Sequence, residues 1–197
     1  DTVRNNIGSN GGGIYNAGIL NIGNSTFYGN SSGTGGAIYN ASTGSLTSIN
    51  NTISNNLANT DSGGYGGGIW NDAGGTMTLQ NTLLVANIGG NCHFYYGTIT
   101  TDASNMADDD TCGLATQKTT AQINLVTAAY NGGSTYTMAL GTLSAAINAG
   151  DDNVCNTAPV QAVDQRGAQR PNGSHSDVGA YEYVDTAAPD TKILTHP

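Results

Sequence analysis

The stretch Gly11-Gly12-Gly13-Ile14-Tyr15-Asn16 decides the fold, because it recurs as Gly35-Gly36-Ala37-Ile38-Tyr39-Asn40 and again as Gly66-Gly67-Gly68-Ile69-Trp70-Asn71. A short apolar run follows each copy. A second block of constant length then closes each repeat, at Asn24 to Asn30, Asn50 to Asn56 and Asn81 to Asn87. Only the segments between the blocks vary in length, so we expect the variable parts to be turns.

Apolar and polar residues alternate within each block, as in Leu20-Asn21-Ile22 and Met77-Thr78-Leu79, which is the period of a strand. Glycine and asparagine separate the blocks and tolerate the backbone angles of tight turns. A strand and turn repeat of roughly 22 to 30 residues predicts an all-β fold, a right-handed parallel β-helix with an irregular C-terminal cap. A leucine-rich repeat has a similar period but needs more leucines than these copies contain.

Stacked coils place corresponding residues in ladders. The predicted ladders comprise two inward apolar ladders, Val3, Phe27, Ile53 and Leu84 and then Ile14, Ile38 and Ile69, and a corner ladder of Asn30, Asn56 and Asn87. The aromatic residues Tyr15, Tyr39 and Trp70 follow inward isoleucines, so we expect them to point outward. Such a stripe has two interpretations, a surface that binds sugar rings or stacking between coils that stabilises the solenoid.

Composition limits the class of protein. The 197 residues suffice for one domain, and 14 acidic against 5 basic residues give a net charge of -9. This charge disfavours nucleic acid and anionic membranes as partners. The sequence has no apolar run long enough for membrane insertion. We interpret the acidic, lysine-poor composition as that of an extracellular protein.

The chain divides into four predicted segments. Residues 1–87 form the β-helix coils, 88–118 a disulfide-bearing loop, 119–184 the last coil or coils and the cap, and 185–197 a linker or extended tail toward a further domain or subunit. Within the second segment, Cys92 and Cys112 flank a loop that a disulfide would close in an oxidising compartment. Cys155 is left over, and the alternative is three free thiols in a cytosolic protein.

Charged residues suggest two further sites. The C-terminal half collects five of them into a predicted structural ion-pair cluster that closes the end of the core, namely Asp164, Arg166, Arg170, Asp177 and Glu182. The run Asp108-Asp109-Asp110, and with less support Asp151-Asp152, offers carboxylates to calcium, although exposed acidic turns are the alternative. His93, His175 and His196 are too scattered to predict a zinc site. The sequence therefore predicts no cofactor, with calcium as the one possible ion.

An enzyme is considered because many parallel β-helices cleave polysaccharides. Hydrolysis needs paired acids on one exposed face, and elimination usually needs a basic residue beside calcium-binding acids. Residues 11–87 contain only Asp61 and Asp72 as acids, and no Lys or Arg. The coils therefore predict no catalytic site, although Asp61, Asp72 and the Asp108 to Asp110 run remain the candidates if one exists.

The ordered set of motifs resembles a bacterial surface module, the choice-of-anchor Q domain. The resemblance covers nearly the whole chain, in the Gly11 to Asn87 repeats, the Cys92 to Cys112 loop, Asn131 to Leu140, Ser144 to Gly150, and the Asp164 to Gly167 and Asp177 to Glu182 motifs. This chain departs from the family pattern at Ala145, Asn148 and Ser176, the last of which leaves Cys155 without its usual partner. The resemblance implies a secreted or cell-surface bacterial protein, often multidomain, and implies no catalytic activity.

These observations favour a non-catalytic structural or adhesive module of a bacterial secreted or cell-surface protein, working with neighbouring domains or a cell-surface glycan. The first alternative is a self-assembling subunit of an extracellular filament, joined through an open coil at residues 1–10 and the tail at 185–197. The second alternative is a polysaccharide-cleaving enzyme.

Overall fold

The structure is a computed structural model that describes residues 1–59, 65–102, 104–114 and 116–184. Two short helices are described, α1 (Thr120–Ile123) and α2 (Asp152–Cys155). The described strands are β1 (Thr2–Arg4), β2 (Ile14–Asn16), β3 (Ile19–Gly23), β4 (Thr26–Tyr28), β5 (Ser31–Ser32), β6 (Ile38–Asn40), β7 (Ser45–Ile49), β8 (Thr52–Ser54), β9 (Leu57–Ala58), β10 (Ile69–Asn71), β11 (Thr76–Gln80), β12 (Leu83–Val85), β13 (Cys92–Phe94), β14 (Thr98–Thr101) and β15 (Met106–Ala107).

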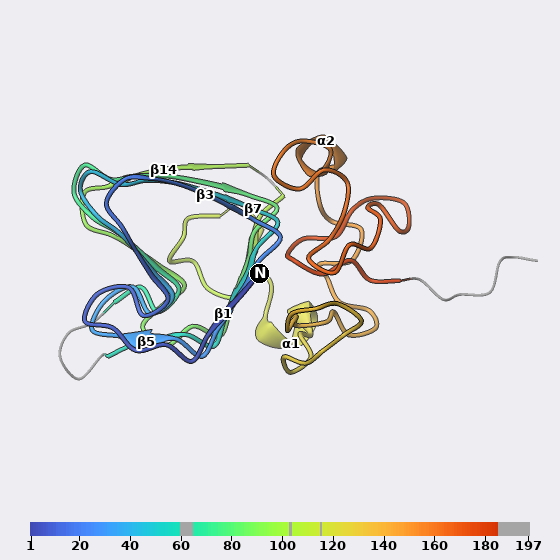
Figure 1. Cartoon of the computed structure of the whole chain (residues 1–197), viewed down its shortest axis with the longest axis horizontal. Coiled ribbons are helices and arrows are strands. Elements are labelled where there is room, and N and C mark those ends of the chain that lie inside the picture. The colour runs from blue at the N-terminus through green and yellow to red at the C-terminus, as the bar shows by residue number, and fades with distance from the viewer. Residues whose placement is uncertain (60–64, 103, 115, 185–197) are drawn as a thin grey trace, which may run out of the picture.

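The strands build three parallel sheets around a triangular coil, seen down its axis in Figure 1. The lateral sheet has the strand order β1-β4-β8-β12-β15 and is named after the layer that lies on it. The aromatic sheet, named after its outward rings, has the order β13-β10-β6-β2, and the sheet here called the third sheet has the order β14-β11-β7-β3. A small sheet pairs β5 with β9. Successive strands of the chain lie in different sheets, and each sheet stacks one strand per turn. The predicted parallel β-helix is therefore confirmed.

The inward ladders form the core of the coil. Val3, Phe27, Ile53 and Leu84 pair in register along the lateral sheet. Along the aromatic sheet, Ile14, Ile38 and Ile69 pair in register in the same way. The glycines before these isoleucines are required by close backbone approach, because a Cβ at Gly36 or Gly67 would collide with carbonyl oxygens of the next turn.

Asparagine amides hydrogen-bond from turn to turn at one corner. Asn30 Nδ2 donates to Asn56 Oδ1 at 2.9 Å, and Asn56 Nδ2 donates to Asn87 Oδ1 at 2.9 Å. Each acceptor oxygen also receives the backbone N–H of the preceding ladder asparagine, at 3.0 Å. The three predicted side chains thus satisfy backbone donors that tight turns leave without a partner. Asn91 extends the ladder by accepting from Asn87 Nδ2 at 2.7 Å.

A second buried ladder was not anticipated from the sequence. Asn16 Nδ2 donates to Asn40 Oδ1 at 2.7 Å, and Asn40 Nδ2 donates to Asn71 Oδ1 at 2.6 Å. These residues end the repeated hexapeptide, so the signal was present in every copy. It explains why each copy closes with asparagine rather than with another small polar residue.

Residues 88–118 are not the loop that the sequence predicted. Strands β13, β14 and β15 pair with β10, β11 and β12 and complete a further turn of the coil. Cys92 takes the inward position of the isoleucines and His93 takes the outward aromatic position. Gly89 and Gly90 keep two of the three glycines, but Asn91, Cys92 and His93 replace the third glycine, the isoleucine and the aromatic residue, which is why the repeat was overlooked in the sequence.

The predicted disulfide between Cys92 and Cys112 is confirmed. It ties the segment that follows β15 across this end of the coil, where Cys112 is buried and Leu114 packs against the inner core. At the opposite end, β1, β2 and β3 are edge strands. Core side chains there, such as Ile14 and Leu20, are only half-buried. The two ends of the described coil therefore differ, one covered and one open.

Residues 119–184, here called the lateral layer, are irregular as predicted but do not stack as a coil or cover an end. Figure 1 shows this part, coloured yellow to red, beside the triangle on the side of β1. It bonds to successive turns of the coil: Thr2 Oγ1 donates to the Tyr136 carbonyl, Thr52 Oγ1 accepts from Ala180 N, and Asn81 Nδ2 donates to the Asp151 carbonyl. The predicted cap is therefore corrected to a layer along the side.

A second hydrophobic core explains this position. The outward faces of β12 and β15 present Leu83, Val85 and Met106, which pack on Ile123 and Val178 of the lateral layer. Leu84 points into the coil from between the other two β12 residues. A strand with three apolar residues in succession is buried on both faces, and this one separates the two cores.

Candidate functional site

The outward aromatic residues form one stack, here called the aromatic ladder: Tyr15, Tyr39, Trp70 and His93. The ring centroids of Tyr15 and Tyr39 lie 5.2 Å apart at an interplanar angle of 4°, and those of Tyr39 and Trp70 lie 6.1 Å apart at 6°. His93 continues the stack 4.4 Å from Trp70. The register of the aromatic sheet therefore places these rings face to face along the coil axis.

This geometry bears on the two interpretations of the aromatic stripe. A sugar packs on the face of an aromatic ring, but Tyr39 and Trp70 each have a neighbour on both faces. Their edges are what remains open to solvent. The arrangement favours stacking between coils as the role of the ladder. Sugar binding by Tyr15, Tyr39 and Trp70 stays a prediction.

The ladder also holds two titratable groups in fixed states. Partial burial, together with a 3.0 Å hydrogen bond from the hydroxyl to Asp72 Oδ2, raises the pKa of Tyr39 to about 12. Burial lowers the pKa of His93 below its ordinary value. At neutral pH Tyr39 and His93 are therefore uncharged, and Asp72 lies beside the ladder as the hydrogen-bond acceptor of Tyr39.

The acidic turn is tied into the covered end of the coil. Asp108 accepts hydrogen bonds from Ala86 N, Asn91 Nδ2 and Thr120 Oγ1, and Asp109 accepts from Asn91 N at 2.9 Å. These two carboxylates thus terminate the asparagine ladder at Asn91. Calcium binding by Asp108, Asp109 and Asp110 stays a prediction, but two of the three side chains are already occupied as acceptors.

The five members of the predicted ion-pair cluster come together, but in the lateral layer and not at an end of the core. Arg166 pairs with Asp164 and Arg170 with Glu182, each at 2.7 Å. Arg170 and Glu182 have fully buried side chains. The expected position was wrong because the layer runs along the coil.

Asp177 lies inside this cluster and accepts from Arg170 Nη1 through its backbone carbonyl at 2.9 Å, whereas its carboxylate is bonded by backbone donors. Its carboxylate accepts from Asn148 N at 2.7 Å and from Tyr183 N. Burial raises the pKa of Asp177 to about 7. The two hydrogen bonds act against this rise, and the nearby negative charge of Glu182 adds to it. Burial likewise raises the pKa of Glu182.

In the part of the chain that the structure describes, no group of three or more His, Cys, Asp or Glu residues could hold a metal ion. Asp61 and His196 lie outside the described residues. Asp151 is the N-cap of α2, and its side chain accepts from Asn153 N. Asp152 pairs with the exposed His175 at 3.0 Å. Cys155 is a free, buried thiol within hydrogen-bond distance of the Asn50 and Asn81 amides.

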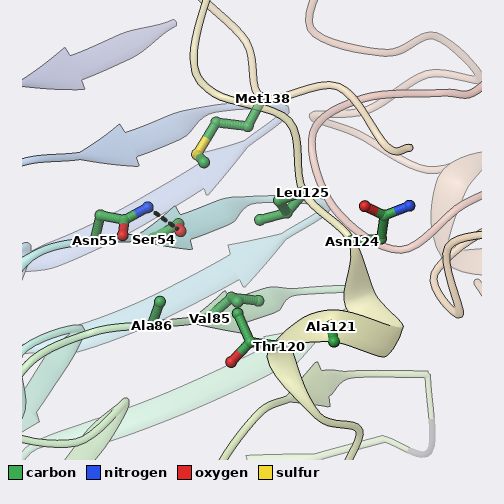
Figure 2. Close-up of a pocket in the computed structure, with 9 residues that line it drawn as sticks. All are labelled: Ser54, Asn55, Val85, Ala86, Thr120, Ala121, Asn124, Leu125 and Met138. Atoms are coloured by element: carbon green, nitrogen blue, oxygen red, sulfur yellow. Dashed lines mark hydrogen bonds between the residues drawn. The ribbon is translucent and has the colours of Figure 1, made fainter.

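The sequence did not reveal a groove of about 500 Å³ between the lateral sheet and the lateral layer. Figure 2 shows its two sides, with Ser54 and Val85 on neighbouring strands and with Leu125 and Met138 on the segments opposite. Its complete lining is Ser54, Asn55, Val85, Ala86, Thr120, Ala121, Asn124, Leu125 and Met138. Four segments far apart in the chain form it, so no local pattern could have indicated it.

Comparison of the chain with family models, curated proteins and solved structures finds no significant match. The resemblance to the choice-of-anchor Q domain therefore stays a prediction. No helix among the described residues has the length and apolar character to cross a bilayer.

Proposed function

We propose that this chain is a non-catalytic structural and adhesive module of an extracellular or cell-surface protein. The observation that carries the proposal is the use of its acids. Their side chains accept hydrogen bonds from backbone N–H groups at Asp72, Asp102, Asp108, Asp109, Asp151, Asp152, Asp164, Asp177 and Glu182.

Such acids are poorly suited to catalysis. A general acid or a nucleophile must face the substrate and exchange a proton or a bond with it. A carboxylate that closes a turn or begins a helix has its lone pairs directed at the chain instead. In this account the acidic composition serves turn structure, and the protein works as a rigid support.

The disulfide supports an extracellular location. Disulfides persist in oxidising compartments and are rare in the cytosol. The asparagine and aromatic ladders add a stiff axis, along which neighbouring domains would be held apart. A rod with polar, mainly uncharged faces suits adhesion to neutral surfaces.

The test is incubation of the purified chain with insoluble neutral and acidic polysaccharides. Retention on the pelleted polymer is measured together with released reducing ends and unsaturated products. We expect retention on a neutral polymer without soluble products. Turnover of any polymer, or failure to bind every surface, would overturn the proposal.

Self-association is a second candidate, favoured by the open end of the coil. The edge strands β1, β2 and β3 present unpaired backbone groups, and Ile7 and Ile19 are largely exposed near them. A head-to-tail filament needs two open ends, whereas the segment after β15 covers the other one. We therefore propose a pair of copies that meet at their open ends. The tail at residues 185–197, expected to contribute to assembly, lies outside the described residues.

Sedimentation over a range of concentrations tests this second candidate. A monomer–dimer equilibrium that Leu20→Asp abolishes supports pairing through the open end. A monomer at all concentrations, or a dimer that Leu20→Asp leaves intact, contradicts it.

A further inference from the structure

We propose that the groove between the lateral sheet and the lateral layer binds a neutral oligosaccharide lying along the coil axis. This inference rests on the proposed adhesive function and names its site and ligand class. Val85 pairs with Ser54 in register, so the floor crosses successive turns of the coil. Residues Asn55 and Ala86, which follow these two, line the groove beside them. The far wall begins at α1, with Thr120 and Ala121.

The groove offers uncharged hydrogen-bonding groups beside aliphatic surface. Asn55 is exposed at the groove, where its Nδ2 donates one proton to Ser54 Oγ at 2.9 Å and keeps the second to donate. Thr120 Oγ1 donates to Asp108 Oδ2 at 2.6 Å, which leaves its lone pairs as acceptors. The exposed Ala121 and the half-buried Ala86 and Leu125 supply apolar surface beside these groups. A sugar presents both features, hydroxyl groups around its edge and C–H groups on its faces.

Charge selects a neutral ligand. Among the described residues, none that lines the groove is charged. The Asp108 carboxylate lies behind the lining and accepts a hydrogen bond from Thr120 Oγ1. The chain has a net charge of -9. Uronic acid polymers, sulfated glycans and nucleic acids would all be repelled.

The sheet topology argues against an extended peptide in this groove. A peptide added to a sheet binds through a free strand edge. Strands β8 and β12 are interior to the lateral sheet, and each is already paired on both sides. The floor therefore exposes side chains and not backbone partners. A flexible peptide backbone would lose hydration there without replacement.

Aromatic residues flank the same column one turn further toward the open end. Tyr28 pairs in register with Ser54, and Arg4 pairs with Tyr28. From the lateral layer, Tyr136 packs under the Arg4 guanidinium at 4.4 Å and against Tyr130 at 4.2 Å. The ring of Tyr130 is mostly exposed. In contrast to Tyr39 and Trp70, which are stacked on both faces, Tyr130 offers an open ring for a sugar that extends beyond the groove.

The test uses calorimetric titration of the full chain with neutral β-linked gluco-, xylo- and manno-oligosaccharides, and with oligogalacturonate as the anionic comparison. Ala121→Trp places an indole in the groove from an exposed position on α1. Its matched control is Ala17→Trp, in the exposed turn between β2 and β3. We expect Ala121→Trp to weaken binding of a neutral ligand by about tenfold or more, and Ala17→Trp to leave it unchanged.

A second variant guards against misfolding of the first. Asn55→Gly removes an amide from the groove while glycine tolerates the φ of 56° found there. We expect it to weaken binding by about threefold to tenfold. If both variants bind the neutral oligosaccharide as tightly as the parent chain, the groove is not its binding site, although the adhesive function stands. Preference for oligogalacturonate would overturn the ligand class, and binding of no oligosaccharide by a chain that still adheres to polymer would overturn the inference alone.

Discussion

Arg170 Nη1 lies 2.7 Å from Glu182 Oε2, and neither side chain is exposed to solvent. Arg170 also donates to the Asp177 and Gly179 carbonyls, and Glu182 accepts from Asn172 N and Asp177 N. This pair is therefore the fixed point around which the end of the lateral layer folds. The Asp177 to Glu182 motif therefore surrounds the Arg170 guanidinium with acceptors.

Removing one partner should be severe. Arg170→Leu removes the arginine donor from the buried Glu182 carboxylate and from two backbone carbonyls. We expect a loss of about 3–5 kcal/mol in the free energy of unfolding. Urea denaturation measures it. The control is His175→Ala, which removes the exposed pair with Asp152 and should cost less than about 1 kcal/mol. Equal losses in the two variants would show that the buried pair is not a fixed point of the fold.

The corner asparagines should contribute more to the stability of the fold than asparagines at exposed positions do. Asn56→Ala removes the acceptor of Asn30 N and the donor to the Phe27 carbonyl, and each unsatisfied buried group costs about 1–3 kcal/mol. Asn21→Ala, at an exposed strand position, should change stability by less than about 0.5 kcal/mol. Thermal unfolding compares the two. A loss for Asn56→Ala no larger than that for Asn21→Ala would argue against the ladder as a stabilising device.

Reduction of the disulfide should loosen one end of the coil. Cys92 and Cys112 are 20 residues apart, and closing a loop of that size stabilises a protein by about 3 kcal/mol. Hydrogen exchange should show faster exchange in β13, β14 and β15 after reduction, with β4 and β8 unchanged. Cys155→Ala should respond to reductant in the same way as the parent chain. Uniform loosening of all turns would contradict a local role for the disulfide.

The pKa of Asp177 gives stability a predictable dependence on pH. Its folded value of about 7 lies above the ordinary 3.8, so the folded state holds a proton that the unfolded state releases. This contribution is complete below pH 4 and is lost as the pH rises toward 7. Asp177→Asn should therefore flatten the fall in unfolding free energy between those values. An identical slope in variant and parent chain would show that Asp177 titrates normally beside Arg170 and Glu182.

The coil was predictable because its information is local and repeated. Each copy of the hexapeptide carries the glycines for close approach, the inward isoleucine and the outward aromatic residue, so register follows from alignment of the copies. The turn at Cys92 was missed because cysteine and histidine replace isoleucine and the aromatic residue, and only Gly89 and Gly90 remain of the three glycines. The pattern of inward and outward positions persists there with only part of its sequence signature.

The lateral layer was harder to place because nothing in it repeats. The succession Leu83-Leu84-Val85 is typical of a strand buried on both faces, but we did not draw that prediction from it, and it does not identify the segment that covers the strand. The groove depends on that cover, since Ser54 and Met138 meet only when the layer folds onto the sheet. Sites built between distant segments are determined by tertiary packing, whereas ladders are determined by the repeat.

A crystal structure of the chain soaked with a neutral β-linked oligosaccharide would show whether and where the sugar binds. We expect an intact sugar chain in the groove, in contact with Asn55 and Leu125 and parallel to the coil axis. A sugar bound on the aromatic ladder would contradict the assignment of the site, and a cleaved sugar would contradict the assignment of a non-catalytic module.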